Sequence, residues 1–359
     1  MKVLYLVNFA GKAGIEKYVE SLARLLPERG AECCFAYNIP GELSEKLERA
    51  GIPCLQLDLS WANALGAART LAGFCRERGI EVIHAQCPRE NVIALLARRL
   101  NRSLRVVYTE HFNRRVGLGW RLLYRHFTPE NHRLIAVCRA SAASMAANGC
   151  RKDKIQVVYN GIDPAQAPPP SDKLRRELAL PPDTLLMVSL SRLSPEKGVG
   201  FLVRALAELK ARTDRPFCCA VAGDGPMEAE VRALAEELGV SDRLRLLGYR
   251  TDTAEILASA DLYVCPSASE ALSFALLEAM NAGLPLAVTA VGGNVELVED
   301  APRCGLTAPY GDAAAFAGIL AELLEQPERR ETLSRAAKEK IRARFDLNQL
   351  AGDVYNTYC

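Results

Sequence analysis

The chain has 359 residues, of which 49% are hydrophobic and 25% charged, and its net charge is +2. This length exceeds what one core usually supports, so two domains are expected, and the composition excludes a disordered or fibrous protein. No apolar run approaches the ~20 residues that a membrane span needs, and Met1-Lys2 leads directly into a strand pattern, so we expect a soluble cytoplasmic protein without a signal peptide. The 12 cysteines include no C-x-x-C pair, which favours buried free thiols over a metal site.

Short apolar runs alternate with helical patterns almost from end to end. The first series of predicted strands comprises residues 3–7, 33–37, 82–85, 105–108, 134–137 and 155–159, and the second comprises 185–190, 217–222, 244–247, 262–265 and 286–289. Helical patterns lie between them, for example at 16–26, 202–210, 227–238 and 316–324. This alternation predicts parallel sheets with right-handed crossovers.

A proline-rich segment, 164–172, separates the two series and contains three consecutive prolines. Such a run favours a stiff, extended spacer, so we place the domain boundary there. The predicted domains are residues 1–165 and 172–342, and a last helix at about 343–359 can pack back on the first domain. Two doubly wound domains would leave a cleft between their sheet edges, where ligands commonly bind.

In the first domain the leading strand ends at Asn8, and a helix begins near Ile15. The small residues Ala13 and Gly14 between them would let a phosphate approach the backbone at the helix end. The dinucleotide fingerprint G-x-G-x-x-G is absent, and the pattern alone fits an ordinary strand-to-helix turn equally well.

In the second domain, Arg192 and Lys197 lie on the loop that follows the strand at 185–190. Paired cations at such a place can hold a diphosphate and stabilise the charge that develops when it leaves. In isolation they fit ordinary surface cations equally well. Gly223 opens a Gly-Asp-Gly-Pro turn that ends the next strand at the same predicted sheet edge.

Glu270 and Glu278 flank the start of a predicted helix after the strand at 262–265. A helix N-terminus at the carboxyl edge of a parallel sheet binds anions, and carboxylates beside it suit a polyhydroxy ligand. Taken alone, a capping and a solvated glutamate would be the commoner explanation. Glu278, however, lies among apolar neighbours, where an unpartnered charge would be costly.

Seven segments occur in the order seen in the retaining glycosyltransferases of family 4, which have the GT-B fold. The chain resembles this family over essentially its whole length. The segments are 13–16, 159–163, Arg192-x4-Lys197-Gly198, Gly223-Asp224-Gly225-Pro226, 247–249, Glu270-x7-Glu278 and 292–296. The resemblance implies an α/β protein with two Rossmann-like parallel-sheet domains that face each other across a cleft.

The resemblance also implies roles for matching residues of the second domain. Glu270 would bind hydroxyls of the donor sugar, and Glu278 would bind the ribose hydroxyls. Arg192 and Lys197 would hold the diphosphate and replace a metal ion. Further donor contacts would come from Gly223, from the backbone near Tyr249, which would meet the nucleobase, and from the N–H groups of Ser273 and Phe274.

In the first domain, Gly14 would approach the phosphate and His111 would lie near the reacting sugar. A lone histidine after a strand is more often structural, and the family pattern reverses that preference. The chain departs from the family where Ala13 and Ala271 replace frequent glycines, which puts the phosphate approach at Ala13 in doubt.

The implied reaction is metal-independent transfer of a hexose from a UDP- or GDP-sugar, with no cofactor and with retained anomeric configuration. The leaving diphosphate would help to deprotonate the acceptor, and cell-envelope or surface polysaccharide synthesis is the expected setting. A nucleotide-sugar 2-epimerase on the same fold and a catalytically silent nucleotide-sugar binder are the alternatives.

The charge is unevenly distributed, because residues 1–165 hold 24 Lys and Arg against 15 Asp and Glu, a net +9. The remainder holds 21 against 28, a net −7. The segment 89–139 carries 11 arginines, no lysine and three glutamates, and 116–127 mixes arginine with bulky apolar residues. That composition predicts a peripheral contact with an anionic membrane, on its inner face, but equally fits a helix packed on its own domain; a nucleic-acid partner is not expected.

Overall fold

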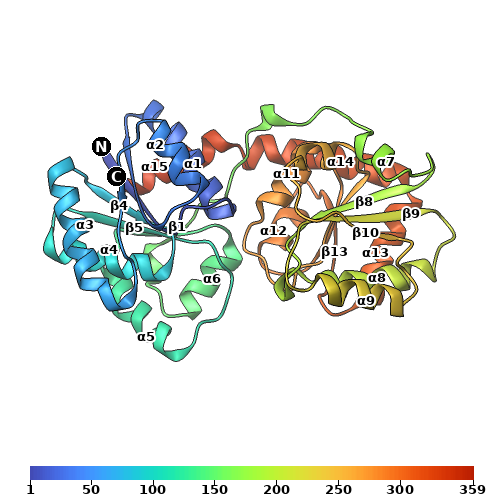
Figure 1. Cartoon of the computed structure of the whole chain (residues 1–359), viewed down its shortest axis with the longest axis horizontal. Coiled ribbons are helices and arrows are strands. Elements are labelled where there is room, and N and C mark those ends of the chain that lie inside the picture. The colour runs from blue at the N-terminus through green and yellow to red at the C-terminus, as the bar shows by residue number, and fades with distance from the viewer. The chain divides into compact units, whose positions relative to one another are not determined.

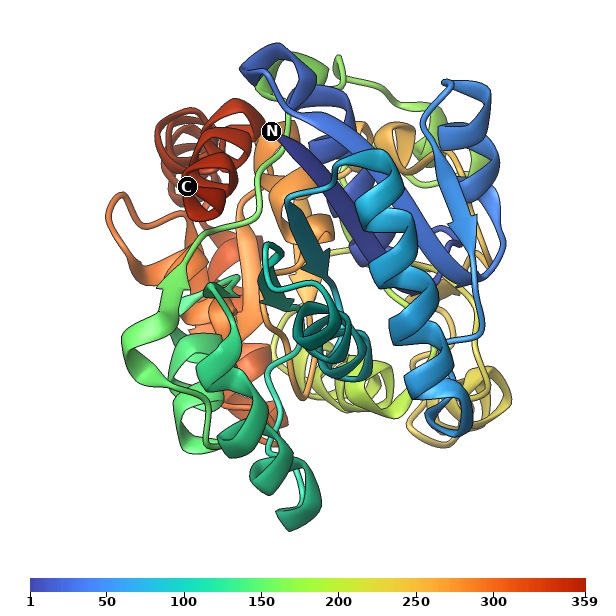
Figure 2. The ribbon, with the colours of Figure 1, turned by 90° about the vertical axis from the view of Figure 1, so that its left-hand side faces the viewer.

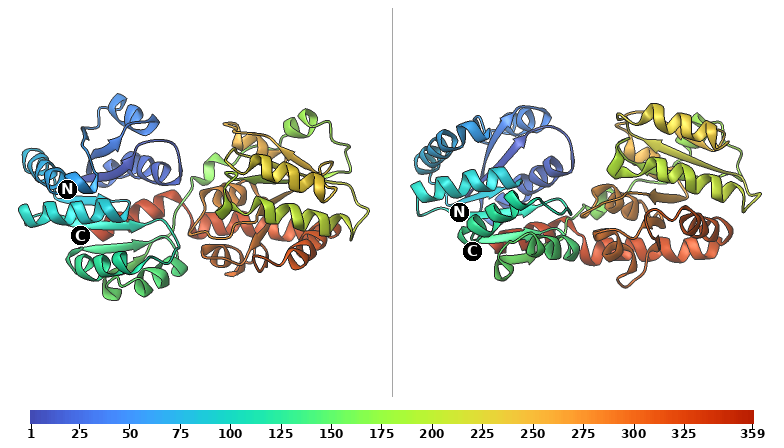
Figure 3. Two further views of the ribbon diagram at one scale, coloured as in Figure 1. Left: turned by 60° about the horizontal axis from the view of Figure 1, so that its bottom comes forward. Right: turned by 90° about the horizontal axis from the view of Figure 1, so that it is seen from below.

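The computed structural model describes residues 1–359, which form two compact units (Figure 1). The N-terminal unit comprises Met1–Asn160 and the C-terminal segment Leu347–Cys359, and the C-terminal unit comprises Gly161–Asp346. The proline-rich segment thus belongs to the C-terminal unit. Each unit is built around one parallel sheet with helices on both sides (Figure 3), which confirms the predicted pair of Rossmann-like domains.

The N-terminal sheet has seven strands in the order β3-β2-β1-β4-β5-β6-β7, and every pairing is parallel. The strands are β1 Lys2–Phe9, β2 Glu32–Ile39, β3 Cys54–Gln56, β4 Val82–Ala85, β5 Arg105–Glu110, β6 Arg133–Ala136 and β7 Ile155–Val157. The central strands β4 and β5 are buried along almost their whole length, because helices cover both faces of the sheet. The order reverses between β1 and β4, so the loops after these strands meet at a topological switch point.

The helices of this unit connect successive strands. They are α1 Gly14–Leu25, α2 Glu42–Arg49, α3 Ala64–Arg78, α4 Pro88–Leu100, α5 Leu118–Phe127, α6 Arg139–Ala147 and α15 Leu347–Tyr358, with short 3-10 turns η1 Pro27–Arg29, η2 Trp61–Asn63, η3 Thr128–Glu130 and η4 Lys152–Lys154. The last helix, α15, packs on α1 and β5 and so closes the unit with the end of the chain.

The C-terminal sheet has six parallel strands in the order β10-β9-β8-β11-β12-β13. They are β8 Leu185–Leu190, β9 Phe217–Ala222, β10 Leu244–Leu246, β11 Leu262–Cys265, β12 Leu286–Thr289 and β13 Gly305–Ala308. The order reverses between β8 and β11. The loop that carries Arg192 and Lys197 and the loop that carries Glu270 therefore share the switch point of this sheet.

The helices of the C-terminal unit pack on both faces of its sheet. They are α7 Lys173–Glu177, α8 Val199–Lys210, α9 Glu228–Glu237, α10 Thr253–Ala258, α11 Phe274–Ala282, α12 Gly293–Glu299, α13 Ala313–Glu325 and α14 Pro327–Arg344, with 3-10 turns η5 Pro164–Gln166 and η6 Pro195–Lys197. None of the helices in the structure is both long and apolar enough to cross a membrane.

Two strands, β3 and β13, were not predicted. β3 has only three residues and none is fully buried, while β13 begins at Gly305 and contains a threonine. Neither forms an apolar run that stands out from a loop, because β3 is short and partly exposed, and β13 is interrupted by a glycine and a threonine although it is mostly buried.

Candidate functional site

The candidate site of the C-terminal unit is centred on an ion pair between Lys197, at the end of η6, and Glu270, in the turn between β11 and α11. Lys197 Nζ lies 2.6 Å from Glu270 Oε1, and Ser267 Oγ donates to the same oxygen at 2.7 Å. The structure thus joins two residues that the sequence placed on separate loops. Their side chains are 28% and 10% exposed, so the pair is largely shielded from solvent but open on one side.

The electrostatic environment keeps Lys197 charged. Burial opposes the charge, but the attraction and the hydrogen bond of Glu270 outweigh it and raise the pKa of the lysine. An ammonium group has three N–H donors, and Glu270 takes one. The remaining donors can bind an anionic ligand.

The backbone around this pair is packed too tightly for side chains at two glycines. Gly198 has φ +65°, and a Cβ there would collide with the carbonyl of Pro266, just after β11. Gly223 has φ +149°, and a Cβ would collide with the carbonyl of Ser191, just after β8. Neighbouring loops therefore touch through backbone atoms at the sheet edge, which explains why glycine stands at both positions.

Other residues predicted for the C-terminal unit lie at the same carboxyl edge of its sheet. Arg192 is exposed on the loop after β8, and its side chain does not join the Lys197–Glu270 pair. Gly223 N donates to Gly248 O at 2.8 Å, which places the neighbouring Tyr249, 62% exposed, beside the turn after β9.

The helix α11 begins as predicted after the Glu270 turn. Ser273 is its N-cap, in extended backbone, and makes no side-chain cap hydrogen bond. The N–H groups at the start of the helix, Phe274 among them, point along the helix axis toward any ligand at this end. Glu278 is half-buried one turn further along, near the buried Tyr263 on β11.

Three further polar residues support the candidate site of the C-terminal unit and were not predicted as site residues. Ser267 binds Glu270, as described, and its carbonyl accepts from Thr289 Oγ1 at 2.6 Å. Asn294 Nδ2 donates to Thr289 O at 3.2 Å and is fully buried. Thr289 is the last residue of β12, so a polar residue at the end of an apolar strand was the sequence signal that could have identified it.

In the N-terminal unit, Gly14 is the exposed first residue of α1. Its predicted neighbour Ala13 is the N-cap and has no side chain to cap the helix. The buried carboxylate of Glu16 accepts hydrogen bonds from the backbone N–H groups of Glu16 itself, Ala13 and Gly11. Burial nevertheless raises the pKa of Glu16, because it outweighs these hydrogen bonds. Glu16 thus fixes the loop and leaves Gly14 accessible.

His111 follows β5 directly, and its partner is Gln86, which follows β4. His111 Nε2 lies 2.9 Å from Gln86 Oε1, while Gln86 Nε2 donates to His84 O at 3.1 Å. Because the amide oxygen can only accept, His111 must carry its proton on Nε2, which leaves Nδ1 as the acceptor of the neutral ring. Burial lowers the pKa of His111 to about 3, so the ring is neutral at pH 7. The sequence did not point to Gln86.

A buried hydrogen-bond network lies beneath His111. His84 Nε2 lies 2.7 Å from Thr109 Oγ1, and His84 Nδ1 lies 2.7 Å from the hydroxyl of Tyr358 on α15. The Tyr18 ring packs edge-on against His111, with ring centroids 5.0 Å apart. Burial also lowers the pKa of His84 to about 3. The network is therefore neutral and joins β4, β5, α1 and the end of the chain.

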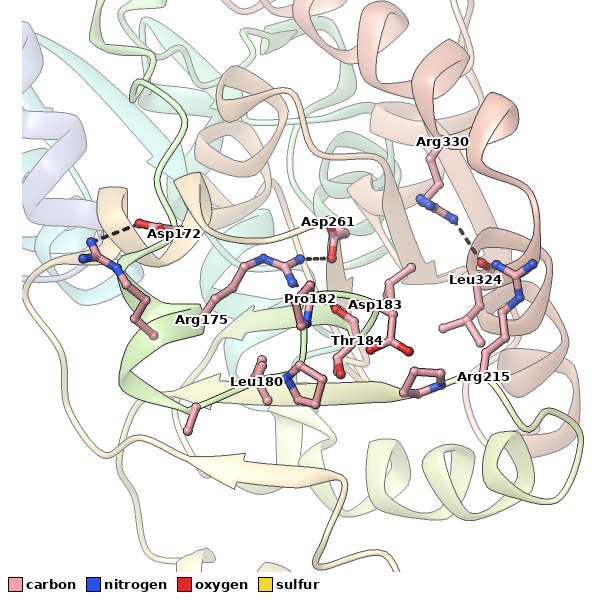
Figure 4. A pocket seen from close by; sticks show the side chains of 15 residues that line it. Asp172, Arg175, Leu180, Pro182, Asp183, Thr184, Arg215, Asp261, Leu324 and Arg330 are labelled. Carbon is pink, nitrogen blue, oxygen red and sulfur yellow. Dashed lines mark hydrogen bonds and ion pairs between the residues drawn. The ribbon is translucent and has the colours of Figure 1, made fainter.

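A separate hollow of about 870 Å³ lies at the opposite edge of the C-terminal sheet (Figure 4). Its lining includes Thr184 and Asp261, which precede β8 and β11. Arg175 pairs with Asp261 and donates to Thr184 O at 2.9 Å, so these polar groups already serve one another. Ligands of parallel sheets bind at the carboxyl ends of the strands, and the hollow lies at the amino ends.

Two family models match the chain, one to each unit. Residues 13–166 match the family described as "Glycosyltransferase Family 4", and residues 170–340 match "Glycosyl transferases group 1".

Individual relatives agree with these matches. The lipopolysaccharide core biosynthesis glycosyltransferase LpsD of Rhizobium meliloti is 26% identical over 96% of this chain and 94% of its own length. The putative colanic acid biosynthesis glycosyltransferase WcaL of Salmonella typhimurium is 29% identical over 66% of this chain and 60% of its own length, less than two thirds of that relative. The crystal structure of HepE from Anabaena in complex with UDP has a TM-score of 0.87 and 25% identity, and the match covers 99% of both chains.

Proposed function

The chain belongs to glycosyltransferase family 4, and on that premise we propose that it is a retaining enzyme that moves a hexose from a nucleotide-sugar donor to an acceptor hydroxyl. The observation that carries the proposal is the Lys197–Glu270 pair at the sheet switch point, beside the N-terminus of α11. A shielded carboxylate suits sugar hydroxyls, and a cation with free donors suits a diphosphate.

The donor is proposed to be a UDP- or GDP-sugar. HepE, a relative of the same fold, has been crystallised with UDP. In this chain Glu278 would bind the ribose, and the backbone beside Tyr249 would meet the base. The N–H groups of Ser273 and Phe274, together with Gly14, would contact the phosphates.

The residues present can drive the transfer electrostatically. The bond between the anomeric carbon and the diphosphate oxygen breaks while the acceptor oxygen bonds to the same face of the sugar. The acceptor proton passes to the leaving diphosphate. Arg192 and Lys197 stabilise the charge that develops on that diphosphate, so no metal ion or cofactor is required. His111 is proposed to lie beside the reacting sugar with Nδ1 as a hydrogen-bond acceptor.

The acceptor is proposed to belong to a cell-envelope or surface glycan, because LpsD and WcaL are described in those terms. The basic N-terminal unit suits a phosphorylated or lipid-linked acceptor.

A donor panel tests the proposal. The purified protein is incubated with UDP-, GDP-, ADP- and CMP-sugars in the presence of EDTA, and free nucleotide is measured. Slow release of UDP or GDP, lost in Glu270→Ala, is expected. An isomerised sugar or binding without turnover would each overturn the proposal. With an acceptor in hand, NMR of the product distinguishes retention from inversion.

A further inference from the structure

A row of polar residues lies along the carboxyl edge of the N-terminal sheet, and the proposed reaction uses only its last member, His111. The strands β2, β1, β4 and β5 are neighbours in this sheet (Figure 2). Asn38 and Asn8 lie near the ends of β2 and β1, and Arg89 follows β4 at the start of α4. The strand order therefore brings Asn38, Asn8 and Arg89 to neighbouring positions, with Gln86 and His111 next along the same edge.

Hydrogen bonds join Asn8, Asn38 and Arg89 into one cluster, which we call the amide–arginine group. Asn38 Nδ2 donates to Asn8 Oδ1 at 3.0 Å, and Arg89 Nη2 donates to the same oxygen. Asn38 is also held through its backbone, because Gln56 Nε2 donates to Asn38 O at 3.3 Å. All three members are partly exposed. The amide–arginine group is thus fixed by its neighbours and open to a ligand.

These hydrogen bonds determine which atoms of the amide–arginine group remain for a ligand. A guanidinium can only donate, so the Asn8 atom that faces Arg89 is the oxygen, and the Asn38 atom that faces this oxygen is the nitrogen. Asn8 Nδ2, with two N–H donors, and Asn38 Oδ1, an acceptor, make no hydrogen bond within the protein. Adjacent side chains therefore offer both donors and an acceptor, a combination that matches sugar hydroxyls, which both donate and accept.

The charge of Arg89 is already compensated. Its Nε and Nη2 donate to Glu90 Oε1 at 3.3 and 3.0 Å, and the Glu90 side chain is only 1% exposed. Lys12, on the loop after β1, is paired in the same way with Glu42 at 3.3 Å. An anionic ligand would have to compete with a buried carboxylate for the guanidinium, whereas a neutral hydroxyl needs only a free N–H or oxygen. The amide–arginine group therefore favours a neutral ligand, although the unit as a whole is basic.

We propose that the amide–arginine group binds the acceptor, and that the part of the acceptor bound there is a neutral sugar. This inference rests on the proposed function. Asn8 Nδ2 donates to one hydroxyl of that sugar and Asn38 Oδ1 accepts from another, which holds the sugar beside the proposed place of reaction near His111. A phosphate or a lipid carried by the acceptor would lie away from this group.

A panel of small acceptors tests the class of ligand. The full chain is incubated with the nucleotide sugar that the donor panel identifies, and nucleotide release is measured with and without each acceptor. The neutral members are the methyl glycosides of glucose, galactose, mannose and N-acetylglucosamine, and the charged members are methyl glucuronide and glucose 6-phosphate. At least one neutral glycoside should raise the rate several-fold above the acceptor-free rate, and neither charged sugar should exceed it.

Asn8→Asp separates ligand binding from a purely structural role. The carboxylate keeps an oxygen for Asn38 and Arg89 but has no N–H to donate to a sugar. The KM for the glycoside should therefore rise about tenfold, while the KM for the donor should stay within about twofold of wild type. Asn101→Asp is the matched control, because Asn101 Oδ1 also accepts, from Ser103 Oγ at 2.8 Å, but lies before β5 at the opposite edge of the sheet. It should change neither KM.

The proposal is wrong if no neutral glycoside raises nucleotide release, or if a charged sugar is clearly preferred to its neutral counterpart. An unchanged glycoside KM in Asn8→Asp would also overturn it, because the amide–arginine group would then only join the loops of its own unit. Nucleotide release from the donor without acceptor tests the proposed function alone, so its absence is distinguishable from a failure of the acceptor panel.

Discussion

The predicted site residues of the C-terminal unit and those of the N-terminal unit use opposite electrostatics. In the C-terminal unit, burial opposes the charge of Lys197, but the attraction and hydrogen bond of its partner Glu270 outweigh burial and raise the lysine pKa. In the N-terminal unit, His111 and Gln86 are both neutral, and burial lowers the histidine pKa to about 3. Burial disfavours the charged form of both Lys197 and His111. The lysine pKa is nevertheless raised because Lys197 has a carboxylate partner, whereas His111 has only a neutral amide partner and its pKa is lowered.

The difference indicates a division of labour. The charge of Lys197 suits the unit that is proposed to bind the diphosphate, because preorganised cations stabilise the negative charge that develops on the leaving group. A neutral ring would suit the proposed place of His111 beside the reacting sugar, because it can accept a hydrogen bond without repelling the cationic character that develops at the anomeric carbon. Each prediction below changes one of these two features.

The largest effect is expected from removing the charge in the C-terminal half. Lys197→Ala should lower kcat by about 10²–10³-fold, the range typical for loss of one transition-state-stabilising donor. Steady-state turnover of the donor identified by the panel measures the effect. Lys210→Ala is the matched control, because Lys210 also pairs with a carboxylate, Asp242, in the same unit. Wild-type turnover in Lys197→Ala would contradict the proposed role of Lys197 in stabilising the leaving diphosphate.

A second prediction tests the tight backbone of the same half. Gly198 and Gly239 both have φ +65°, but only Gly198 has a carbonyl where a Cβ would lie. Gly239→Ala should cost about 1–2 kcal/mol of stability from left-handed backbone alone. Gly198→Ala should cost more and should also raise the KM for the donor, since Pro266 must move. Urea unfolding followed by circular dichroism compares the two, and equal stability with unchanged KM would contradict the close approach.

A third prediction introduces charge into the neutral half. Gln86→Glu places a carboxylate on His111 Nε2, which favours the imidazolium and should raise the His111 pKa from about 3 toward neutrality. Titration of the four histidines by NMR shows the shift directly. Turnover should fall about tenfold below pH 7, where the ring becomes charged. Gln86→Leu should leave the His111 pKa low, which separates charge from lost positioning.

The depressed pKa values also fix the sign of an acid effect in the wild type. Between pH 6.5 and about 3 the unfolded chain binds protons at His84 and His111 that the folded chain excludes. Stability is therefore complete above pH 6.5 and falls as the pH is lowered, by up to about 1.4 kcal/mol per pH unit for each histidine. Unfolding free energies measured at pH 7 and 5.5 check this; a rise in stability at pH 5.5 would contradict the neutral network.

The sequence predicted the two sheets and most strand positions, because central parallel strands are apolar runs that stand out by themselves. It also placed Lys197 and Glu270 at one sheet edge, because the carboxyl ends of parallel strands meet there. It did not show that they contact each other, since 73 residues separate them along the chain and only the strand order brings the loops together.

The neutral half was less predictable. Gln86 and Thr109 are uncharged, and nothing in their local pattern distinguishes them from ordinary strand-end residues. Tyr358 contacts His84 because α15, which follows the C-terminal unit in sequence, packs on the N-terminal unit. Contacts between residues so distant in sequence depend on tertiary packing and leave no periodic trace.

The smallest predicted effect concerns the contact of α15 with the N-terminal unit through Tyr358 and His84. Tyr358→Phe removes the hydroxyl 2.7 Å from His84 Nδ1 and should cost about 1–2 kcal/mol, because a buried imidazole nitrogen loses its partner. Both tryptophans lie in the N-terminal unit, so urea unfolding followed by their emission reports on this unit alone. Tyr355→Phe, at a half-buried position of the same helix, should be near neutral. Equal stability of the two variants would mean that the neutral half does not depend on α15. A selective loss in Tyr358→Phe would show that the end of the chain completes it.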